Sequence, residues 1–371
     1  MKNEAPIRVL HVLQRMEAGG TQALLMNIYR HIDRKKIQFD FIVEYLEKQF
    51  YDDEIVNLGG RIFYCSVRED YNLVKFQRDI RKIISNNNYK IIHVHAYTIG
   101  YFVLKEAHKY GIPVRIAHSH SNGMTNDHKK IIKKILQKMY LLHATDFMAC
   151  SRDAGEYLFK NQNYTVLKNA IDSSKFTASK EYRKYIRKEL RINDSFVIGH
   201  IGRFKPEKNH EFIIKVFMEI KNIKNNAKLV LVGNGDLETS IKNLAITKNI
   251  EADVMFLGSR SDVNVILNGF DAFIFPSKYE GLGIVAIEAQ ACGIPLLCSE
   301  NIPSEVEITP LFNRMSISES PRAWANRIID ISRNRNAHKD MQELIIKNGY
   351  DISQATNTLQ DYYLERYMNY M

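Results

Sequence analysis

Short, continuous runs of Val, Ile and Phe recur along this 371-residue chain, and a polar or helix-like stretch follows each of them. Strands buried on both faces have this composition, because helices cover both sides of a parallel sheet. The alternation therefore predicts an α/β fold with doubly wound parallel sheets. In the first half the runs are Ile7–Leu13, Phe39–Tyr45, Arg61–Val67, Ile91–Ala96, Val114–His120, Asp146–Ser151 and Tyr164–Ile171. In the second half they are Phe196–Gly202, Lys228–Gly233, Val254–Gly258, Asp271–Ser277 and Ile294–Ser299.

The length of the chain indicates two domains, because 371 residues exceed what one hydrophobic core usually serves. Two series of strands predict two Rossmann-like domains, at 1–175 and 192–352, with a basic linker at 176–191. The aromatic-rich tail, about 353–371, predicts a C-terminal helix that packs back on the first domain. Further predicted helices are Thr21–Arg30, Asn72–Ser85, His210–Ile220, Asp236–Asn249 and Ile284–Cys292.

The bulk composition excludes several classes of protein. With 45% hydrophobic and 25% charged residues, the chain is ordinary for a soluble globular protein. No apolar run approaches membrane-spanning length, and the N-terminus lacks a signal-peptide core. The four cysteines show no metal-ligand or redox spacing, and no Asp-x-Asp triplet or His/Cys cluster indicates a metal site. We therefore expect a cytoplasmic protein with reduced thiols and no bound metal.

The net charge of +10 is unevenly distributed. Residues 1–176 hold 27 Lys and Arg against 18 Asp and Glu, whereas residues 192–371 carry a net charge of −3. This asymmetry argues against a uniform nucleic-acid-binding coat and indicates one face that meets something anionic.

One basic segment, 128–143, has the spacing of an amphipathic helix. Such a helix can lie on the anionic inner face of a cell membrane. An ordinary core helix with a solvated lysine face is the alternative. On a helix, Lys130, Lys133, Lys134 and Lys138 would lie roughly together, and the apolar side chains that fall largely opposite are Ile131, Ile135, Leu136, Met139 and Leu142.

Two carboxylates stand where a strand meets a helix in the second half. Glu280 follows the apolar run Asp271–Ser277, and Glu288 comes about two helical turns later, so both can reach one ligand over the helix start. A carboxylate in the otherwise apolar stretch 284–292 needs a polar partner, which a ribose diol would provide. Exposed helix carboxylates without a ligand are the alternative.

The turn between these carboxylates suits an anion. Gly281 and Gly283 allow a ligand to approach the backbone closely, and the N–H groups at the helix start, around Leu282 and Ile284, face any anion there. The turn therefore predicts a site for a phosphorylated, hydroxyl-rich ligand such as a nucleotide sugar.

A cationic loop leaves the first strand of the second half. Gly202 ends the run Phe196–Gly202, and Arg203 and Lys208 precede a helix that begins near Asn209. Two cations beside a helix N-terminus form a site for a diphosphate, with a solvated charge cluster as the alternative.

Two loops of the first half begin at the carboxyl ends of strands, the edge where open α/β sheets bind ligands. The paired Gly19 and Gly20 at a helix start can cradle a phosphate or simply make a tight turn. His118 and His120 end a strand, where either can carry a proton or donate to a sugar oxygen. A strand-end histidine bonded to backbone is the alternative for both.

In this order, the motifs resemble those of the family 4 retaining glycosyltransferases, near the capsular and exopolysaccharide members. The resemblance covers nearly the whole chain. It implies the GT-B architecture, in which two Rossmann-like domains face each other across a cleft. The motifs are the Gly19-Gly20 loop, His118-Ser119-His120, Asn169-Ala170-Ile171-Asp172, Gly202-Arg203 with Lys208, and Glu280 to Glu288.

The resemblance also implies a role for individual residues. Arg203 and Lys208 would bind the diphosphate, and Gly20 would close over it. Glu288 would hold the ribose, while Glu280 would meet the transferred sugar. Two fixed cations would stabilise the charge that grows on the leaving diphosphate, so the reaction would need no metal.

The implied reaction moves a hexose-type sugar from a nucleoside diphosphate sugar to a hydroxyl of a glycan acceptor, with retention of the anomeric configuration. The expected donor is a UDP-sugar. Either His118 or His120 would lie at the sugar. The donor is a co-substrate, so no cofactor is expected. The implied partners are that donor, a glycan acceptor carried on a polyprenyl diphosphate, and an anionic membrane surface, but no nucleic acid. The process would be surface polysaccharide biosynthesis.

Three other functions fit parts of the pattern. A nucleotide-sugar epimerase shares the fold and the need for Glu and His near a diphosphate, but it needs no second sugar acceptor. A catalytically silent partner subunit would lose the charged residues, which are intact here. A dehydrogenase is disfavoured, since the first strand lacks the Gly-x-Gly-x-x-Gly turn.

Overall fold

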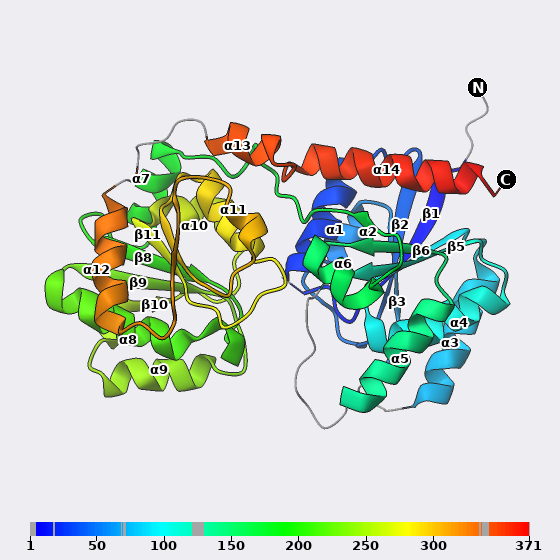
Figure 1. Ribbon diagram of the computed structural model, residues 1–371, viewed down its shortest axis with the longest axis horizontal. Coiled ribbons are helices and arrows are strands. Elements are labelled where there is room, and N and C mark those ends of the chain that lie inside the picture. Colours follow the sequence, from blue (N-terminus) through cyan, green and yellow to red (C-terminus); the bar gives the residue numbers. More distant parts are fainter. Residues whose placement is uncertain are drawn as a thin grey trace. The chain divides into compact units, whose positions relative to one another are not determined.

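The computed structural model divides into two units, each built on one parallel sheet with helices on both faces (Figure 1). The first unit comprises Met1–Ala170 and Ile352–Met371, and the second comprises Ile171–Asp351. The structure describes residues 5–17, 19–67, 69, 72–120, 130–333, 335 and 341–370, with the backbone alone described at 97, 98 and 130–134.

Seven parallel strands form the sheet of the first unit. They are β1 Ile7–Val12, β2 Ile37–Val43, β3 Arg61–Tyr64, β4 Ile91–Val94, β5 Val114–Ser119, β6 Asp146–Ala149 and β7 Thr165–Val166. Their order in space is β3-β2-β1-β4-β5-β6-β7, which starts in the middle and winds outward in both directions. Each strand overlaps one of the seven predicted apolar runs.

Helices cover both faces of this sheet. They are α1 Gly20–His31, α2 Asp52–Asn57, α3 Leu73–Asn86, α4 Tyr97–Lys109, α5 Lys130–Leu142, α6 Arg152–Phe159 and α14 Ile352–Met368. On one face α1 packs against α14, over a core that includes Phe39, Phe41 and Tyr363. On the other face α3 and α4 cover a core that includes Phe76 and Leu104. The aromatic tail is helical here because its apolar side chains have a surface to bury against.

Six parallel strands form the sheet of the second unit. They are β8 Phe196–Ile201, β9 Ala227–Val232, β10 Val254–Phe256, β11 Ala272–Phe275, β12 Leu296–Ser299 and β13 Phe312–Met315. Their order is β10-β9-β8-β11-β12-β13, the same outward winding from the first strand. The predicted fold class, two Rossmann-like doubly wound sheets, is confirmed.

Helices again lie on both faces of the sheet. They are α7 Lys180–Glu189, α8 His210–Ile223, α9 Glu238–Thr247, α10 Val263–Gly269, α11 Ile284–Ala291, α12 Pro321–Ser332 and α13 Met341–Lys347, with short 3₁₀ turns at Pro206–Lys208, Glu251–Asp253 and Ser304–Val306. The core under α8, α9 and α12 contains Phe217 and Trp324, and the core under α10 and α11 contains Phe270 and Ile287.

Two features of the second unit differ from the prediction. Strand β13 was not predicted, because it lies at the sheet edge and two of its four residues, Asn313 and Arg314, are polar, so it does not form a continuous apolar run. The expected linker 176–191 is wrong, since this segment contributes α7 to the second unit. There Ile186 is buried, and the guanidinium of Arg187 donates to the carboxylate of Asp271 at 2.6 Å.

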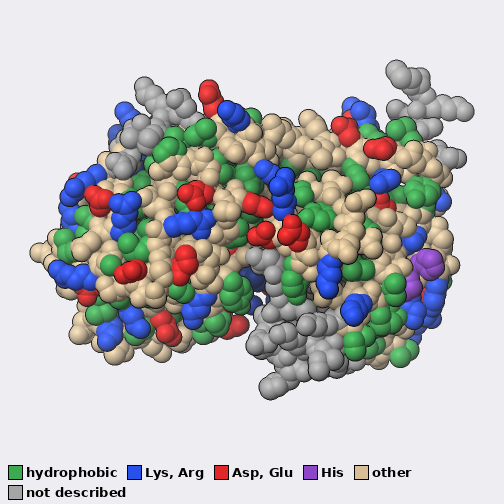
Figure 2. Space-filling view, viewed as in Figure 1, with side chains coloured by type: hydrophobic (Ala, Val, Ile, Leu, Met, Phe, Trp, Pro, Cys, Tyr) green, Lys and Arg blue, Asp and Glu red, His purple; other side chains and the backbone are tan. Residues whose placement is uncertain are grey.

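Charges of both signs share the surface. On the face in Figure 2, Lys and Arg side chains lie among Asp and Glu side chains on each unit, so no uniform basic coat is present on that face. In the described ranges, no helix combines the length and the apolar character needed to cross a membrane.

The basic segment at 128–143 contributes α5, but the side chains of its first half, including Lys130, Lys133 and Lys134, lie outside the described residues. Further along the helix, Leu136 and Met139 pack against the core. The neighbouring Ile135 and Leu142 are exposed, as is Lys138.

Candidate active site

The cationic loop after β8 meets the acidic turn before α11 in the second unit. Nζ of Lys208 lies 2.5 Å from Oε1 of Glu280, and the two side chains are only 16% and 10% exposed. Separately, the backbone N–H of Lys278 donates to the carbonyl oxygen of Glu207 at 2.8 Å. The fold therefore brings together two predicted site residues that are far apart in the sequence.

Glycine and an aromatic ring shape the space around Lys208. Its ammonium lies 5.4 Å from the ring centroid of Phe275 at the end of β11. A Cβ added at Gly202 would lie 3.4 Å from the Lys208 side chain, and one at Gly233, where φ is +132°, would clash with the carbonyl of Gly202. The missing side chains let the loops after β8 and β9 pack closely and leave backbone for a ligand to approach.

Arg203 lies in the same loop, and the described residues offer its side chain no partner. Its side chain is exposed, and it makes no hydrogen bond or ion pair with the residues that the structure describes. An exposed guanidinium without a counter-ion can bind a phosphate through two parallel N–H···O bonds.

Glu288 lies on α11 between the fully buried Ile287 and Ala289. Across the described part of the chain, its carboxylate has neither a hydrogen bond nor an ion pair. Burial raises the pKa of Glu288 to about 7. A buried carboxylate without hydrogen bonds is unfavourable, so a ligand that donates hydrogen bonds to it would be bound more tightly.

The N-terminus of α11 belongs to the same site. Gly283 precedes the first helical residue, Ile284, with φ of +84°, a conformation that side chains disfavour. A Cβ built on Gly283 would lie 3.7 Å from Cγ of Glu280, so the turn abuts the ion pair. Leu282 is buried and anchors the turn, while Gly281 is partly exposed. The unbonded N–H groups of a helix start attract anions.

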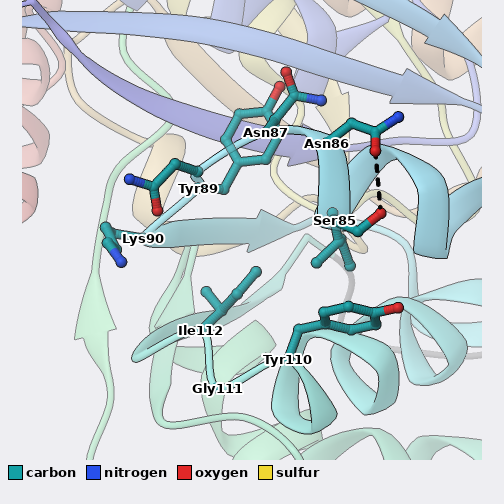
Figure 3. Close-up of a pocket in the computed structure, with 10 residues that line it drawn as sticks. Ser85, Asn86, Asn87, Tyr89, Lys90, Tyr110, Gly111 and Ile112 are labelled. Atoms are coloured by element: carbon teal, nitrogen blue, oxygen red, sulfur yellow. Dashed lines mark hydrogen bonds between the residues drawn. The ribbon is translucent and has the colours of Figure 1, made fainter.

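A pocket of about 390 Å³ lies in the first unit, at the amino ends of β4 and β5 (Figure 3). Asn86, Asn87 and Asn88 line it, and the hydroxyl of Ser85 donates to Oδ1 of Asn86 at 3.4 Å. Parallel sheets bind ligands at the carboxyl ends of their strands. This pocket therefore lies at the opposite edge of the sheet from the predicted site residues of the first unit, which lie at the carboxyl ends of β1 and β5.

The predicted residues of the first unit lie at the carboxyl ends of β1 and β5. Gly19 precedes the first residue of α1, Gly20, and a Cβ at Gly20 would meet nothing within 4 Å. His118 lies in β5 and is fully buried, whereas His120 follows the strand and is partly exposed. Of the two histidines, His120 is therefore the one that a ligand can reach.

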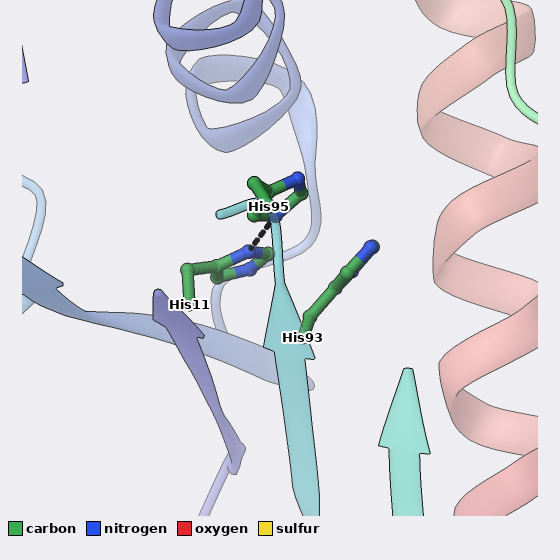
Figure 4. A group of neighbouring side chains, drawn as sticks. All are labelled: His11, His93 and His95. Atoms are coloured by element: carbon green, nitrogen blue, oxygen red, sulfur yellow. Dashed lines mark hydrogen bonds between the residues drawn. The ribbon is translucent and has the colours of Figure 1, made fainter. Parts of the chain in front are cut away.

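Three histidines that no sequence pattern had singled out join this pair. His11 lies on β1, opposite His93 of β4. His95 comes just after the end of β4, two residues beyond His93, and so points to the same face as His93. Figure 4 shows His11 and His95 facing each other, while His93 turns toward α14.

The first hydrogen-bonded chain of histidines runs along the sheet edge. Nδ1 of His11 lies 3.1 Å from Nε2 of His95, and Nδ1 of His95 lies 2.8 Å from Nε2 of His120. Burial lowers the pKa of His11 and of His120 to about 3. Burial, together with repulsion from His93, lowers the pKa of His95 well below its ordinary value. All three are neutral imidazoles at pH 7.

The second chain begins on the C-terminal helix. The hydroxyl of Tyr363 lies 2.5 Å from Nδ1 of His93, and Nε2 of His93 lies 2.9 Å from Nδ1 of His118. Nε2 of His118 is buried and has no hydrogen-bond partner among the described residues. Burial lowers the pKa of both histidines well below the ordinary value, so they too are neutral.

The expectation of no histidine cluster is therefore wrong. Parallel strands bring to one edge side chains that are 25 and 84 positions apart in the sequence. A signal was present, because His93-Val94-His95 and His118-Ser119-His120 each place two histidines on one face of a strand end.

Two Rossmann-like sheets, with a cation and carboxylate site at the carboxyl ends of β8 and β11, define a GT-B-type glycosyltransferase. Residues 18–175 match the family model described as Glycosyltransferase Family 4, and residues 182–351 match Glycosyl transferases group 1. The chain is 34% identical to the putative glycosyltransferase EpsF of Bacillus subtilis, over 97% of each chain. It belongs to glycosyltransferase family 4, as the motifs predicted.

Two more distant similarities extend over nearly the whole chain. A UDP-Gal:alpha-D-GlcNAc-diphosphoundecaprenol alpha-1,3-galactosyltransferase of Escherichia coli is 22% identical over 98% of both chains. The structure of HepE of Anabaena in complex with UDP-glucose has a TM-score of 0.81 at 16% identity, covering 97% of this chain and 100% of that one, which supports the fold. The chain is thus a glycosyltransferase.

Proposed function

We propose that this protein transfers a hexose-type sugar from a UDP-sugar to a hydroxyl group of a lipid-linked glycan, with retention of the anomeric configuration. The observation that carries the proposal is the pairing pattern in the second unit. Lys208 and Glu280 neutralise each other, while Arg203 and Glu288 lack partners in the described structure. A cation without a partner suits a diphosphate, and a carboxylate without a partner suits a ribose diol.

The proposed reaction breaks the bond between the anomeric carbon and the diphosphate oxygen and forms a bond to the acceptor oxygen. The proton of the acceptor hydroxyl passes to the leaving diphosphate. Arg203, Lys208 and the start of α11 stabilise the negative charge that grows on that diphosphate. When Lys208 turns to the diphosphate, Glu280 is released toward the sugar. No metal takes part, so transfer persists in EDTA.

His120 is the proposed contact with the transferred sugar, because it is partly exposed at the end of β5. Since burial lowers the pKa of His120 to about 3, it acts as a neutral hydrogen-bond donor or acceptor instead of a cationic acid. The turn at Gly19 and Gly20 remains a predicted phosphate contact.

The nature of the donor is tested by thermal shift with UDP, GDP, ADP and their sugar conjugates. We expect the largest shift with a UDP-sugar, and its loss in Arg203→Ala but not in the matched variant Lys205→Ala from the same loop. Equal shifts for all three nucleosides would contradict the choice of UDP.

The reaction class is tested by product analysis with and without a lipid-linked acceptor. A glycosylated lipid that forms only when acceptor is present supports transfer. An isomerised nucleotide sugar in the absence of acceptor would instead identify an epimerase. The galactosyltransferase of Escherichia coli, which acts on a diphosphoundecaprenol-linked sugar, supports the choice of acceptor.

Contact with an anionic membrane through α5 is part of the proposal. The exposed Ile135, Lys138 and Leu142 support it, because a basic helix with exposed apolar side chains can lie on lipid. We expect sedimentation with anionic vesicles that weakens as salt rises, and that weakens further in Lys138→Glu. Sedimentation that salt does not change would contradict this contact.

A further inference from the structure

We propose that His95, His118 and His120 form a binding site for one divalent transition-metal ion such as Zn²⁺. One ring nitrogen from each residue lies within 4.8 Å of the others. His95 and His120 are partly exposed, so an ion can reach the site, and the fully buried His118 forms its floor. The three side chains come from the ends of two neighbouring strands, β4 and β5, which hold them on a rigid scaffold.

The chemistry of the ligands selects the class of metal. The group consists of imidazoles alone, and each of them offers one ring nitrogen as a ligand. Nitrogen ligands without carboxylates favour Zn²⁺, Ni²⁺, Cu²⁺ or Co²⁺ over Mg²⁺ and Ca²⁺. Zn–N distances of about 2.0–2.1 Å place tetrahedral nitrogens roughly 3.4 Å apart. Nδ1 of His95 and Nε2 of His120 now lie 2.8 Å apart in a hydrogen bond. These two atoms need to separate only slightly to bind one ion.

The outer hydrogen bond of one of these ligands, His118, is already in place. Nε2 of His118 lacks a described partner, and Nδ1 of the same ring faces Nε2 of His93 at 2.9 Å. With a metal on Nε2, the proton of His118 sits on Nδ1 and is donated to His93, which in turn donates to the hydroxyl of Tyr363. Metal-binding histidines generally have such an acceptor for their second nitrogen, which fixes the tautomer and the ring orientation.

A second group, His11, His93 and His95, meets the same distance limit. We assign the ion to the first group because His11 and His93 are fully buried.

Three protein ligands leave a fourth position for water or a substrate oxygen. Because His120 is the proposed contact with the sugar, a bound ion would compete with the donor and inhibit transfer. This competition rests on the proposed function, whereas the binding of the ion does not.

The test uses the full-length protein without a histidine tag, stripped of metal and titrated with Zn²⁺ by calorimetry and with Co²⁺ by visible absorption. We expect one ion per chain and the intense bands of four-coordinate Co²⁺. His120→Ala should weaken binding by more than about 10-fold, since removing even an outer-shell partner costs 10–100-fold. The double variant His108→Ala/His143→Ala, from a histidine pair whose ring centroids are 5.5 Å apart, is the matched control and should keep full affinity.

Three results would overturn the site: no binding, a six-coordinate Co²⁺ spectrum, or unchanged affinity in His120→Ala. His11→Asn separates the two groups, because retained binding supports the assignment and lost binding overturns it. Thermal unfolding without metal checks that each variant is folded. If Zn²⁺ binds but leaves donor affinity unchanged, the proposed sugar contact of His120 fails while the metal site stands.

Discussion

The ammonium of Lys208 and the carboxylate of Glu280 form an ion pair at 2.5 Å, joining the loop after β8 to the turn before α11. Both side chains are mostly buried, so neither is a solvated surface charge. Arg203 and Glu288 belong to the same predicted site but have no such pairing in the described part of the molecule. The site therefore has one cation and one carboxylate available for a ligand.

The ion pair can be tested by a double-mutant cycle. Lys208→Met should lower the free energy of unfolding by about 1–3 kcal/mol, because it leaves a part-buried carboxylate without its cation. The double variant Lys208→Met/Glu280→Gln should regain most of that loss, since no unpaired charge remains, but it should still lack transfer. Urea unfolding of the four proteins measures the coupling. Purely additive losses would show that the pair does not stabilise the fold.

Arg203→Ala should separate stability from function. The side chain is exposed and unpaired within the described structure, so the free energy of unfolding should stay within about 0.5 kcal/mol of wild type. Losing a charged hydrogen bond worth about 1.5–3 kcal/mol should weaken UDP binding by roughly 10- to 100-fold. Calorimetry with UDP measures this, with Lys205→Ala as the control. Equal weakening in both variants would point to general charge instead of a specific contact.

Glu288→Gln should change stability in a pH-dependent way. Burial raises the pKa of Glu288 to about 7 from 4.5, so the folded state holds a proton that the unfolded chain has released between these pH values. The stability from this proton is fully present below pH 4.5 and is lost as pH rises through 7. Glu288→Gln should therefore gain up to about 3 kcal/mol relative to wild type on going from pH 4 to pH 8.

Chemical unfolding of both proteins at the two pH values measures this difference. The same variant should bind UDP more weakly at pH 8, because an amide offers one acceptor oxygen where a carboxylate offers two. A variant that is no more stable at pH 8 than at pH 4, relative to wild type, would mean that the carboxylate is solvated.

Tyr363→Phe should destabilise the first unit. The ring is fully buried, and its hydroxyl is the described partner of Nδ1 of His93. Leaving that nitrogen without a partner should lower the free energy of unfolding by about 1–3 kcal/mol. Tyr370→Phe, at an exposed position of the same tail, is the matched control and should have no measurable effect. Thermal unfolding of the two variants decides, and equal melting temperatures would contradict the role of the hydroxyl.

Sequence patterns predicted most strands but not every element. The strands β1 to β12 overlap apolar runs, because a strand covered by helices on both faces cannot carry many polar side chains. Half of the residues of the edge strand β13 are polar, so the pattern of apolar runs did not predict this strand. The segment at α7 resembles a linker because most of its residues are charged, and the burial of Ile186 and Arg187 depends on neighbours far away in the sequence.

By itself the sequence determined the two parallel sheets, the family, and the strand ends that carry Arg203, Lys208, Glu280 and Glu288. These features follow from local periodicity and from the order of the motifs, both of which can be read directly from the amino-acid sequence. Tertiary structure alone decided which of those charges pair and which remain available. It also gathered five histidines from β1, β4 and β5 at one edge, because the register between parallel strands, and not spacing along the chain, sets which side chains meet.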